Sequence, residues 1–291
     1  MASGLTTTDA LRDSLDDVRM SARIVLEFEG RMSRTVDRQT LPRNQGLSWQ
    51  EISYAQLTSQ LITETTVEEN FQQLSDTLLT ITPQVRSIAT LITDRVAARI
   101  SSIGFARTGG LSENAVVRGM DEDGVSLFGS AGTDLGGSGA LSSGRVAAAI
   151  VRAAAGNLTD KPPANDQMFM THHSYVLKDI EDELRATIGT GEVTNGLTRM
   201  TFENGFRGRI NTAQVVEDNN IPINSNVAIG GAYARSAIVL VLGRTIRAEV
   251  ERRAIGGGST AMWVRSEYAY GERAAGARLF GLTNDATAPT S

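Results

Sequence analysis

Cysteine is absent from this 291-residue chain, and proline occurs only 6 times against 29 glycines. Without cysteine the chain can form no disulfide, no thiolate nucleophile and no cysteine-ligated zinc site. The excess of glycine over proline indicates many turns and long loops rather than a proline-rich linker. The length and the 41% apolar content indicate one or two domains with an ample core.

Long apolar runs are also missing. The first residues, MASGLTTTDALRD, lack the basic start and apolar stretch of a signal peptide. No apolar run is longer than Ala237–Leu242, which is far too short to span a bilayer. We therefore expect a soluble chain with no membrane partner.

Lysine is scarce as well. The chain has 28 basic residues, of which only Lys161 and Lys178 are lysines. Arginine forms planar, bidentate ion pairs and tolerates interfaces better than lysine does. A GC-rich genome and extensive subunit contact both explain this preference. The net charge of −5 does not indicate an overall groove for nucleic acid.

Residues able to form a metal site are few. His172 and His173 are the only histidines, and adjacent residues of a strand point to opposite faces. We expect one inward and one outward histidine, not two ligands of one metal. The run Asp121-Glu122-Asp123 could bind a cation, but a solvated or salt-bridged acidic turn is the default interpretation.

A glycine-rich stretch, GGSGALSSGR (Gly136–Arg145), precedes an expected helix. A phosphate-binding loop needs a buried strand just before it and, in nucleotide loops, a Lys followed by Ser or Thr. Both are missing, so we interpret the stretch as a flexible connection. The sequence therefore predicts no catalytic, cofactor-binding or metal residue, and a chain that is not an enzyme.

The N-terminal part alternates helical and extended patterns. Residues Thr8–Gly30 show apolar spacing typical of an amphipathic helix, which needs a surface to lie on. Met32–Ser75 is polar and indicates an extended two-strand excursion that needs an external partner, since isolated hairpins are marginal. Thr77–Asp94 predicts two strands around Pro83. The glycines of Ser101–Phe128 predict a broken helix.

The remaining elements are mostly short. We expect helices at Ser142–Ala155 and Ser174–Glu183, a glycine-punctuated loop at Gly189–Arg209 and a loose polar tail, TNDATAPTS. We expect a buried strand within DQMFMTHHSY and a further strand at INTAQVVED. TIRAEVERR is expected to form a half-buried strand with Ile246, Ala248 and Val250 pointing inward. Two more strands are expected, at AMWVRSEYAY and ARLFGL.

The order of these parts resembles the major capsid protein of tailed bacteriophages. The resemblance covers nearly the whole chain and rests on the series rather than on one motif. Its most specific stretches are RGMDEDGVSLFGS (Arg118–Ser130), VVEDNNIPINSNVAIGGAYARSAIVLVLGRTIRAEVERR (Val215–Arg253) and SEYAYGERAAGARLFGLTNDATAP (Ser266–Pro289).

By this resemblance the fold is α+β, of the Hong Kong 97 type. Residues 1–37 would be the N-terminal arm, and residues 38–75 the extended loop that laps a neighbouring subunit. Residues 76–130 and 240–291 would form the peripheral domain with its long spine helix, and residues 131–239 the axial domain. The small residues after NNIP would let backbones pack closely where the chain leaves the axial domain.

The resemblance also implies a function. The chain would self-assemble into pentamers and hexamers of an icosahedral head shell enclosing phage double-stranded DNA. Its partners would be its own copies, the portal protein, and DNA held non-specifically on the inner face, with a separate scaffold protein and a cement protein as further candidates. It would reside in the virion after assembly in the host bacterial cytoplasm.

Two departures from relatives bear on assembly. Some relatives crosslink their shells through Lys–Asn bonds from the extended loop, but no lysine lies between residues 1 and 160 here. The expected first helix begins by Thr8, so we expect a separate scaffold or none. The alternatives are an encapsulin-like cellular compartment and, more remotely, a soluble enzyme with a glycine-rich cofactor loop.

The loop Gly189–Arg209 is the predicted contact around the capsomer axis. In relatives the equivalent loop points at the five- or six-fold axis, and glycines suit a loop that must adopt two conformations. Charges of opposite sign could pair around the ring, and these residues are Arg199, Glu203, Arg207 and Arg209. A plain surface loop away from any axis is the alternative.

Overall fold

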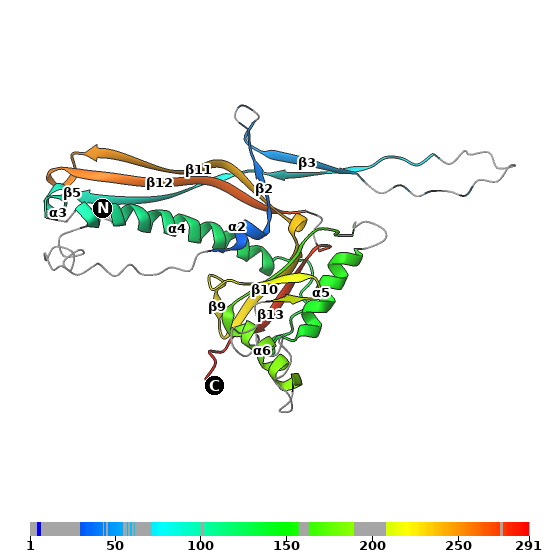
Figure 1. The fold of residues 1–291 in the computed structure, drawn as a ribbon. Helices are drawn as coiled ribbons and strands as arrows, with labels where there is room; N and C mark the ends of the chain where they lie inside the picture. Colours follow the sequence, from blue (N-terminus) through cyan, green and yellow to red (C-terminus); the bar gives the residue numbers. More distant parts are fainter. Residues whose placement is uncertain are drawn as a thin grey trace.

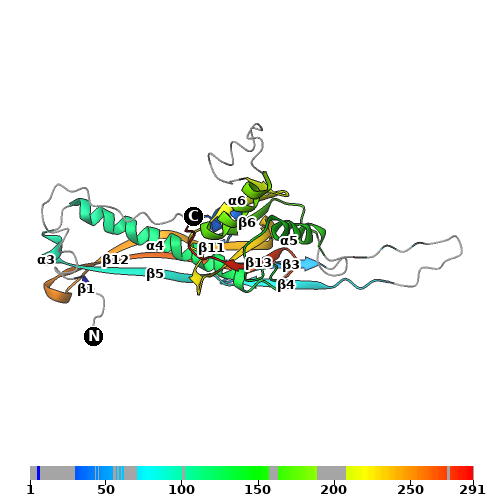
Figure 2. The ribbon, with the colours of Figure 1, turned by 90° about the horizontal axis from the view of Figure 1, so that it is seen from below.

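Figures 1 and 2 show three parts: a long helix lying along an elongated sheet, a second sheet with its own helices, and a hairpin that extends away from both. The structure, a computed structural model, describes residues 5–6, 30–42, 44, 46–54, 57, 59, 61, 71–99, 102–156, 163–188, 208–273 and 276–290. The helix predicted at Thr8–Gly30 lies outside these residues, apart from Gly30.

The elongated sheet has five strands in the order β1-β5-β12-β11-β2. Its centre is antiparallel, and the short edge strands β1 and β2 pair in parallel. The strands are β1 (Leu5–Thr6), β2 (Asp37–Thr40), β5 (Gln84–Thr93), β11 (Ile238–Arg253) and β12 (Ser259–Glu272). Two short helices flank the sheet, α2 (Met32–Thr35) and α3 (Asp94–Ala97).

The long helix α4 (Ser102–Gly129) runs unbroken beside this sheet, so the prediction of a broken helix was wrong. Each glycine destabilises a helix interior by about 1 kcal/mol relative to alanine. Packing outweighs that penalty, because Val116, Val125 and Phe128 are buried along the helix. Gly124 is moreover required, since a β-carbon there would lie 2.6 Å from Met32 Cγ and 2.9 Å from Tyr270 Cζ.

The second sheet has the order β13-β10-β6-β8-β7, with β9 added beside β10. Its strands are β6 (Met168–His172), β7 (Arg209–Ile210), β8 (Ala213–Glu217), β9 (Ile223–Asn224), β10 (Val227–Ala234) and β13 (Leu279–Asp285). The helices α5 (Ser143–Ala155) and α6 (Ser174–Ile188) belong to this part, and Ser142 Oγ caps α5 by accepting a hydrogen bond from Arg145 N at 3.4 Å.

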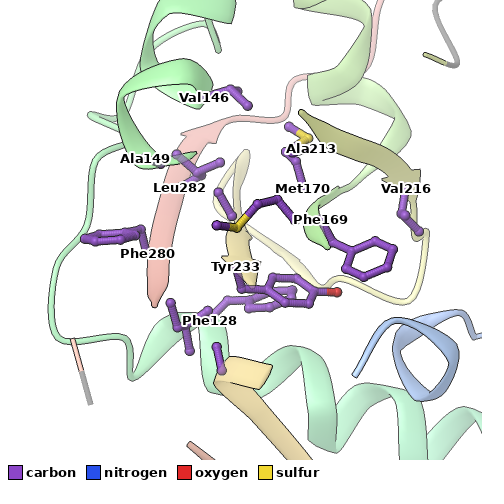
Figure 3. Close-up of a cluster of buried hydrophobic side chains, with 14 of the residues drawn as sticks. Phe128, Val146, Ala149, Phe169, Met170, Ala213, Val216, Tyr233, Phe280 and Leu282 are labelled. Atoms are coloured by element: carbon purple, nitrogen blue, oxygen red, sulfur yellow. The ribbon is translucent and has the colours of Figure 1, made fainter. Parts of the chain in front are cut away.

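Both faces of this second sheet are covered, which is why every residue of β6 is buried. Figure 3 shows Val146 and Ala149 of α5 beside Leu282 and Met170. Phe128 and Tyr233 meet in the same cluster, with ring centroids 5.5 Å apart. The largest core of the described residues therefore lies around this sheet and the end of α4.

Small residues allow this close packing, as expected. A β-carbon on Gly231 would overlap the Phe128 ring, and one on Gly230 would overlap His172 and the Thr171 carbonyl. Only glycine permits these approaches. The distinctive Gly230-Gly231-Ala232 stretch therefore sets the distance between β10, β6 and α4.

Several predicted elements are confirmed and others need correction. The strands around Pro83 and in AMWVRSEYAY and ARLFGL are present, as are both later helices. INTAQVVED is not one strand but the β7–β8 hairpin. The tail is not loose at its start, because Asn284 and Ala286 are buried at the end of β13. TIRAEVERR forms half of β11, but it is not half-buried, since Ala248 and Val250 are exposed.

The fold is α+β, as predicted. The predicted domain boundaries remain a prediction, with one point to note: β13 lies within residues 240–291 but pairs with β10 in the second sheet. No helix within the described ranges is both long and apolar enough to cross a membrane. The third part, the β3–β4 hairpin (Trp49–Tyr54 and Asp76–Ile81), is described with the site.

Candidate subunit interface

The β3–β4 hairpin leaves the body of the molecule and stands apart from both sheets (Figure 1). Six residue pairs join its strands, from Trp49–Ile81 at the root to Tyr54–Asp76. Beyond them, Leu61 is 94% and Phe71 88% exposed. Large apolar side chains are exposed along the described part of the segment, at Leu47, Ile52, Tyr54, Leu57, Leu61, Phe71, Leu74 and Leu78.

The root of the hairpin is held by Arg273, just after β12. Its Nε donates to Glu51 Oε2 and its Nη1 to Asp37 Oδ2, each at 2.7 Å. The guanidinium also lies over the Trp49 ring, 5.8 Å from its centroid. Burial alone would raise the pKa of Asp37, but hydrogen bonds from Arg273 and Gln39 outweigh it, and the pKa is lowered.

A small apolar cluster completes the root. Ile81, Val239 and Val241 are buried together, and Trp49 and Leu79 pack against them. A β-carbon on Gly271 would overlap the Ile81 side chain, so β12 and the hairpin approach closely there. The hairpin is thus fixed at one end while its length exposes apolar surface, as expected of a segment that binds another chain.

The sequence predicted an excursion of two strands within Met32–Ser75, and these bounds were wrong. Of the two hairpin strands only β3 lies within them, since β4 is the first of the two strands predicted around Pro83, and Met32–Thr40 forms α2 and β2 instead. No sequence pattern predicted the anchor. Arg273 lies 222 residues from Glu51 and 236 from Asp37 along the chain, so no local spacing joins them. An arginine-rich composition was the only signal, and it did not single out this residue.

The acidic run is not a turn, which corrects that prediction, because all three residues lie in the interior of α4. Glu122 pairs with Arg118 one turn earlier, at 3.5 Å. Asp123 accepts hydrogen bonds from Arg86 Nη2 and from the Tyr268 hydroxyl, each at 2.7 Å. These two contacts tie α4 to β5 and β12. Asp121 is buried and belongs to a different contact, described below.

Both histidines are buried, so the expectation of one outward histidine was wrong. His172 Nε2 lies 3.0 Å from the Leu282 carbonyl and its Nδ1 accepts from His173 N at 2.9 Å, which identifies a neutral ring with the proton on Nε2. Burial lowers its pKa to about 4. His173 Nδ1 accepts from Tyr175 N at 3.1 Å, at the start of α6. Within the described ranges, no group of three or more His, Asp or Glu side chains is placed to hold a metal.

The glycine-rich stretch is a loop as far as Ser142, where α5 follows, and several backbone N–H groups of the loop have acceptors within the chain; its predicted flexibility stays a prediction. Leu135 N donates to the Gly281 carbonyl at 2.8 Å and Ser138 N to the Thr283 carbonyl at 3.1 Å, so the loop packs along β13. Carboxylates of α6 occupy the start of α5: Leu141 N donates to Asp179 at 3.0 Å, and Ser143 N to Glu183 at 2.7 Å. The chain's own acidic groups thus occupy the position that a phosphate would take.

The predicted axis residues Arg199, Glu203 and Arg207 lie outside the described residues. Arg209 begins β7 instead of belonging to a loop, and it pairs with Gln214 of β8. Its side chain is exposed. The axis contact therefore stays a prediction.

Comparison with known proteins gives matches at the level of structure. No family model and no curated protein sequence matches the chain. A structure from Mycobacterium phage Che8 shares 16% identity over 93% of this chain and 97% of its own, with a TM-score of 0.69. The capsid of Helicobacter pylori bacteriophage KHP30 shares 13% identity over 92% and 95%, with a TM-score of 0.69.

A further match is not a phage protein by its description. An encapsulin of Synechococcus elongatus shares 9% identity over 99% of both chains, with a TM-score of 0.66. The TM-scores of 0.66 to 0.69 establish the fold, and the coverage shows that it extends over nearly the whole chain. The chain therefore has the Hong Kong 97-type fold that phage capsids and an encapsulin share.

Proposed function

We propose that the chain is the major capsid protein of a tailed phage, a structural protein without catalytic activity. The observation that carries the proposal is the β3–β4 hairpin, anchored at its root by Arg273 and exposing Leu61 and Phe71. Monomeric proteins rarely expose so many apolar side chains on one segment, and such a surface marks a contact with another chain. The shared fold supports the same conclusion.

The proposal includes the arrangement of the shell. Copies of the chain form pentamers and hexamers, and the hairpin of one subunit lies on its neighbour. The shell encloses double-stranded DNA, contacted without sequence preference. The portal protein, a separate scaffold and a cement protein are further proposed partners, and the virion is the proposed location after assembly in the host cytoplasm.

Assembly of the purified full-length chain tests the proposal. We expect shells or capsomers in electron micrographs, and their loss in Leu61→Glu and Phe71→Glu, because a carboxylate would be buried at the contact. Phe71→Leu is the matched control, which keeps an apolar side chain and should still assemble. A chain that stays monomeric at every concentration would contradict the shell function. Normal assembly of both glutamate variants would reject the hairpin as the contact.

An encapsulin-like compartment is the second candidate, because the match to the Synechococcus encapsulin covers 99% of both chains. The two functions differ in what the shell encloses. Particles purified from cells that express the gene in its native setting would contain DNA in the first case and protein cargo in the second. Nuclease-protected DNA inside the particles would reject the compartment.

A further inference from the structure

Two aspartates meet at the point where three segments of the chain join. Asp121, in α4, is 2% exposed, and Asp218, directly after β8, is fully buried. The third segment is the stretch from Gly30 to Met32, which leads into α2. A β-carbon on Gly30 would overlap the Asp121 carboxyl group, so this stretch lies directly against it.

Asp121 accepts hydrogen bonds through both of its oxygens. Met32 N donates to Oδ1 and Asn220 Nδ2 donates to Oδ2, each at 2.9 Å. Two N–H donors on two oxygens suit an ionised carboxylate, which only accepts. Asp121 thereby ties α4 both to the stretch before α2 and to the turn between β8 and β9.

Asp218 has a different set of neighbours. Its Oδ1 accepts from Asn220 N at 3.0 Å, and the backbone N–H of Arg31 also hydrogen-bonds to this carboxyl. Its Oδ2 is buried and meets no N–H or O–H donor. Asn220 brings the two carboxyl groups together, because its backbone N–H donates to Asp218 and its side-chain amide donates to Asp121. Both side chains are buried, so ionising both would place two like charges close together away from water, and the pair favours holding one proton.

The surroundings favour that proton. Burial first, and then the neighbouring Asp121, raise the pKa of Asp218 to about 7. From β10 the Tyr233 hydroxyl faces the pair, and it is engaged with Thr35 at 2.6 Å. From β12 Tyr270 faces Asp121, and burial raises its pKa, which keeps it neutral. From β6 the His172 carbonyl accepts from Asp218 N at 3.0 Å.

We infer that Asp121 and Asp218 form a proton-binding site that fastens residues 30–32 to α4 and to the β8–β9 turn. With one proton shared, the pair carries one charge, and consecutive backbone N–H groups of Arg31 and Met32 bind its two carboxyls. When the proton leaves, two buried charges adjoin and repel, and the attachment loosens. This site stands on the described contacts alone; only its use in controlling the arm of a shell subunit rests on the proposed function.

The direction of the pH effect follows from the linkage between proton binding and the attachment of residues 30–32. A carboxyl whose folded-state pKa is raised binds its proton more tightly when the joint is closed than when it is open. The attachment is therefore strongest at low pH, weakens as the pH rises from the ordinary aspartate value, and reaches its weakest level just above the folded pKa of about 7. His172 stays neutral through the upper part of this range, because burial lowers its pKa to about 4.

Amide hydrogen exchange on the unassembled full-length protein tests the site. We expect protection of the Arg31 and Met32 amides, corrected for intrinsic rates, to fall at least about tenfold between pH 5.5 and 8.5, since one pKa unit is a tenfold change in proton affinity. Asp218→Asn should abolish the fall, because its amide can donate to Asp121 without titrating. Asp182→Asn, at an exposed aspartate paired with Lys178, is the matched control and should keep it.

The outcomes separate clearly. Protection that does not change with pH in the unmodified protein, or an unchanged fall in Asp218→Asn, would overturn the inference. If that variant does not fold, the carbon-13 shift of the Asp218 carboxyl in the unmodified protein decides, because a titration midpoint at the ordinary aspartate value rejects the site. Neither measurement depends on shell formation, so failure here is distinct from failure of the proposed function.

Discussion

The six-stranded sheet and the β3–β4 hairpin use the same apolar residue types with opposite results. All five residues of β6 are buried between helices on both faces, whereas Leu61 and Phe71 of the hairpin segment are 94% and 88% exposed. Burial of apolar surface stabilises by about 25 cal/mol per Å². The sheet obtains this stabilisation within its own chain. Within the described residues the hairpin does not obtain it, and under the proposed function a neighbouring subunit would supply it, so the two regions would divide folding from assembly.

The largest expected effect comes from a matched pair of leucine truncations. Leu282→Ala in β13 removes a fully buried side chain, and we expect the free energy of unfolding to fall by about 3 kcal/mol. Leu61→Ala should change it by less than about 0.5 kcal/mol, because that side chain is already in water. Urea unfolding of the unassembled protein measures both. Equal losses of unfolding free energy in the two variants would show that the hairpin contributes to the stability of the monomer as the sheet does.

A second prediction uses pH, since the sheet contains His172, His173 follows directly after β6, and the hairpin has no histidine. Burial lowers the pKa of His172 from 6.5 to about 4. The unfolded chain therefore takes up a proton that the folded chain refuses, so His172 contributes stability that is lost as the pH falls from about 6.5 to about 4. Asp218, whose folded pKa is raised to about 7, contributes in the opposite direction over this range, so the loss due to His172 is measured against a variant that keeps Asp218. Urea midpoints across this range measure the loss.

The variant His172→Gln serves as the control for that loss. A glutamine does not titrate, whereas Asp218 titrates in both proteins, so the urea midpoint of the unmodified protein should fall relative to that of the variant as the pH falls from about 6.5 to about 4. An identical slope in the variant would show that other groups cause the acid sensitivity.

The third prediction concerns the root that joins the two regions. Arg273→Leu leaves Asp37 and Glu51 without their partner, and we expect a loss of about 1 kcal/mol, since these ion pairs are partly exposed. Hydrogen exchange should rise in β3 and β4 and stay unchanged in β10 and β13. Arg273→Lys, which keeps the charge but not the fork that reaches both carboxylates, should give an intermediate rise. Faster exchange in both regions would show that the root also stabilises the sheet.

Local patterns predicted much of the fold, and long-range contacts account for what they missed. The spacing of apolar residues and the turn residues located the strands around Pro83 and the helix capped by Ser142, because each of these signals depends only on residues close together in the sequence. They could not show that Phe128 packs on Tyr233, 105 residues away by number, and so they predicted that α4 would break. The burial of His173 was missed for the same reason.

The candidate site could also be predicted only in part. The lack of a clear apolar core in Met32–Ser75 pointed to a segment that needs a partner, and the exposed side chains of Leu61 and Phe71 agree with it, although β4 of the hairpin lies outside that range. The Asp121–Asp218 pair could not be predicted, since its members lie 97 positions apart in the sequence and meet only through the fold. Each residue alone has the sequence context of an ordinary surface aspartate.

The smallest expected effect lies within α4, which borders both regions. Among the described residues, no atom outside the neighbouring helix backbone lies within 4 Å of a β-carbon built on Gly119, so Gly119→Ala should stabilise the unassembled protein by about 0.5–1 kcal/mol through helix propensity. Gly124→Ala has the opposite sign, because its β-carbon meets Met32 and Tyr270. Thermal unfolding distinguishes the two. If Gly119→Ala stabilises the monomer yet reduces particle yield, a neighbouring subunit approaches the helix there, and the glycine serves assembly as the hairpin does. If particle yield is unchanged, no neighbouring subunit contacts that face of α4. The helix would then contribute to folding only, and the hairpin would be the region that contributes to assembly.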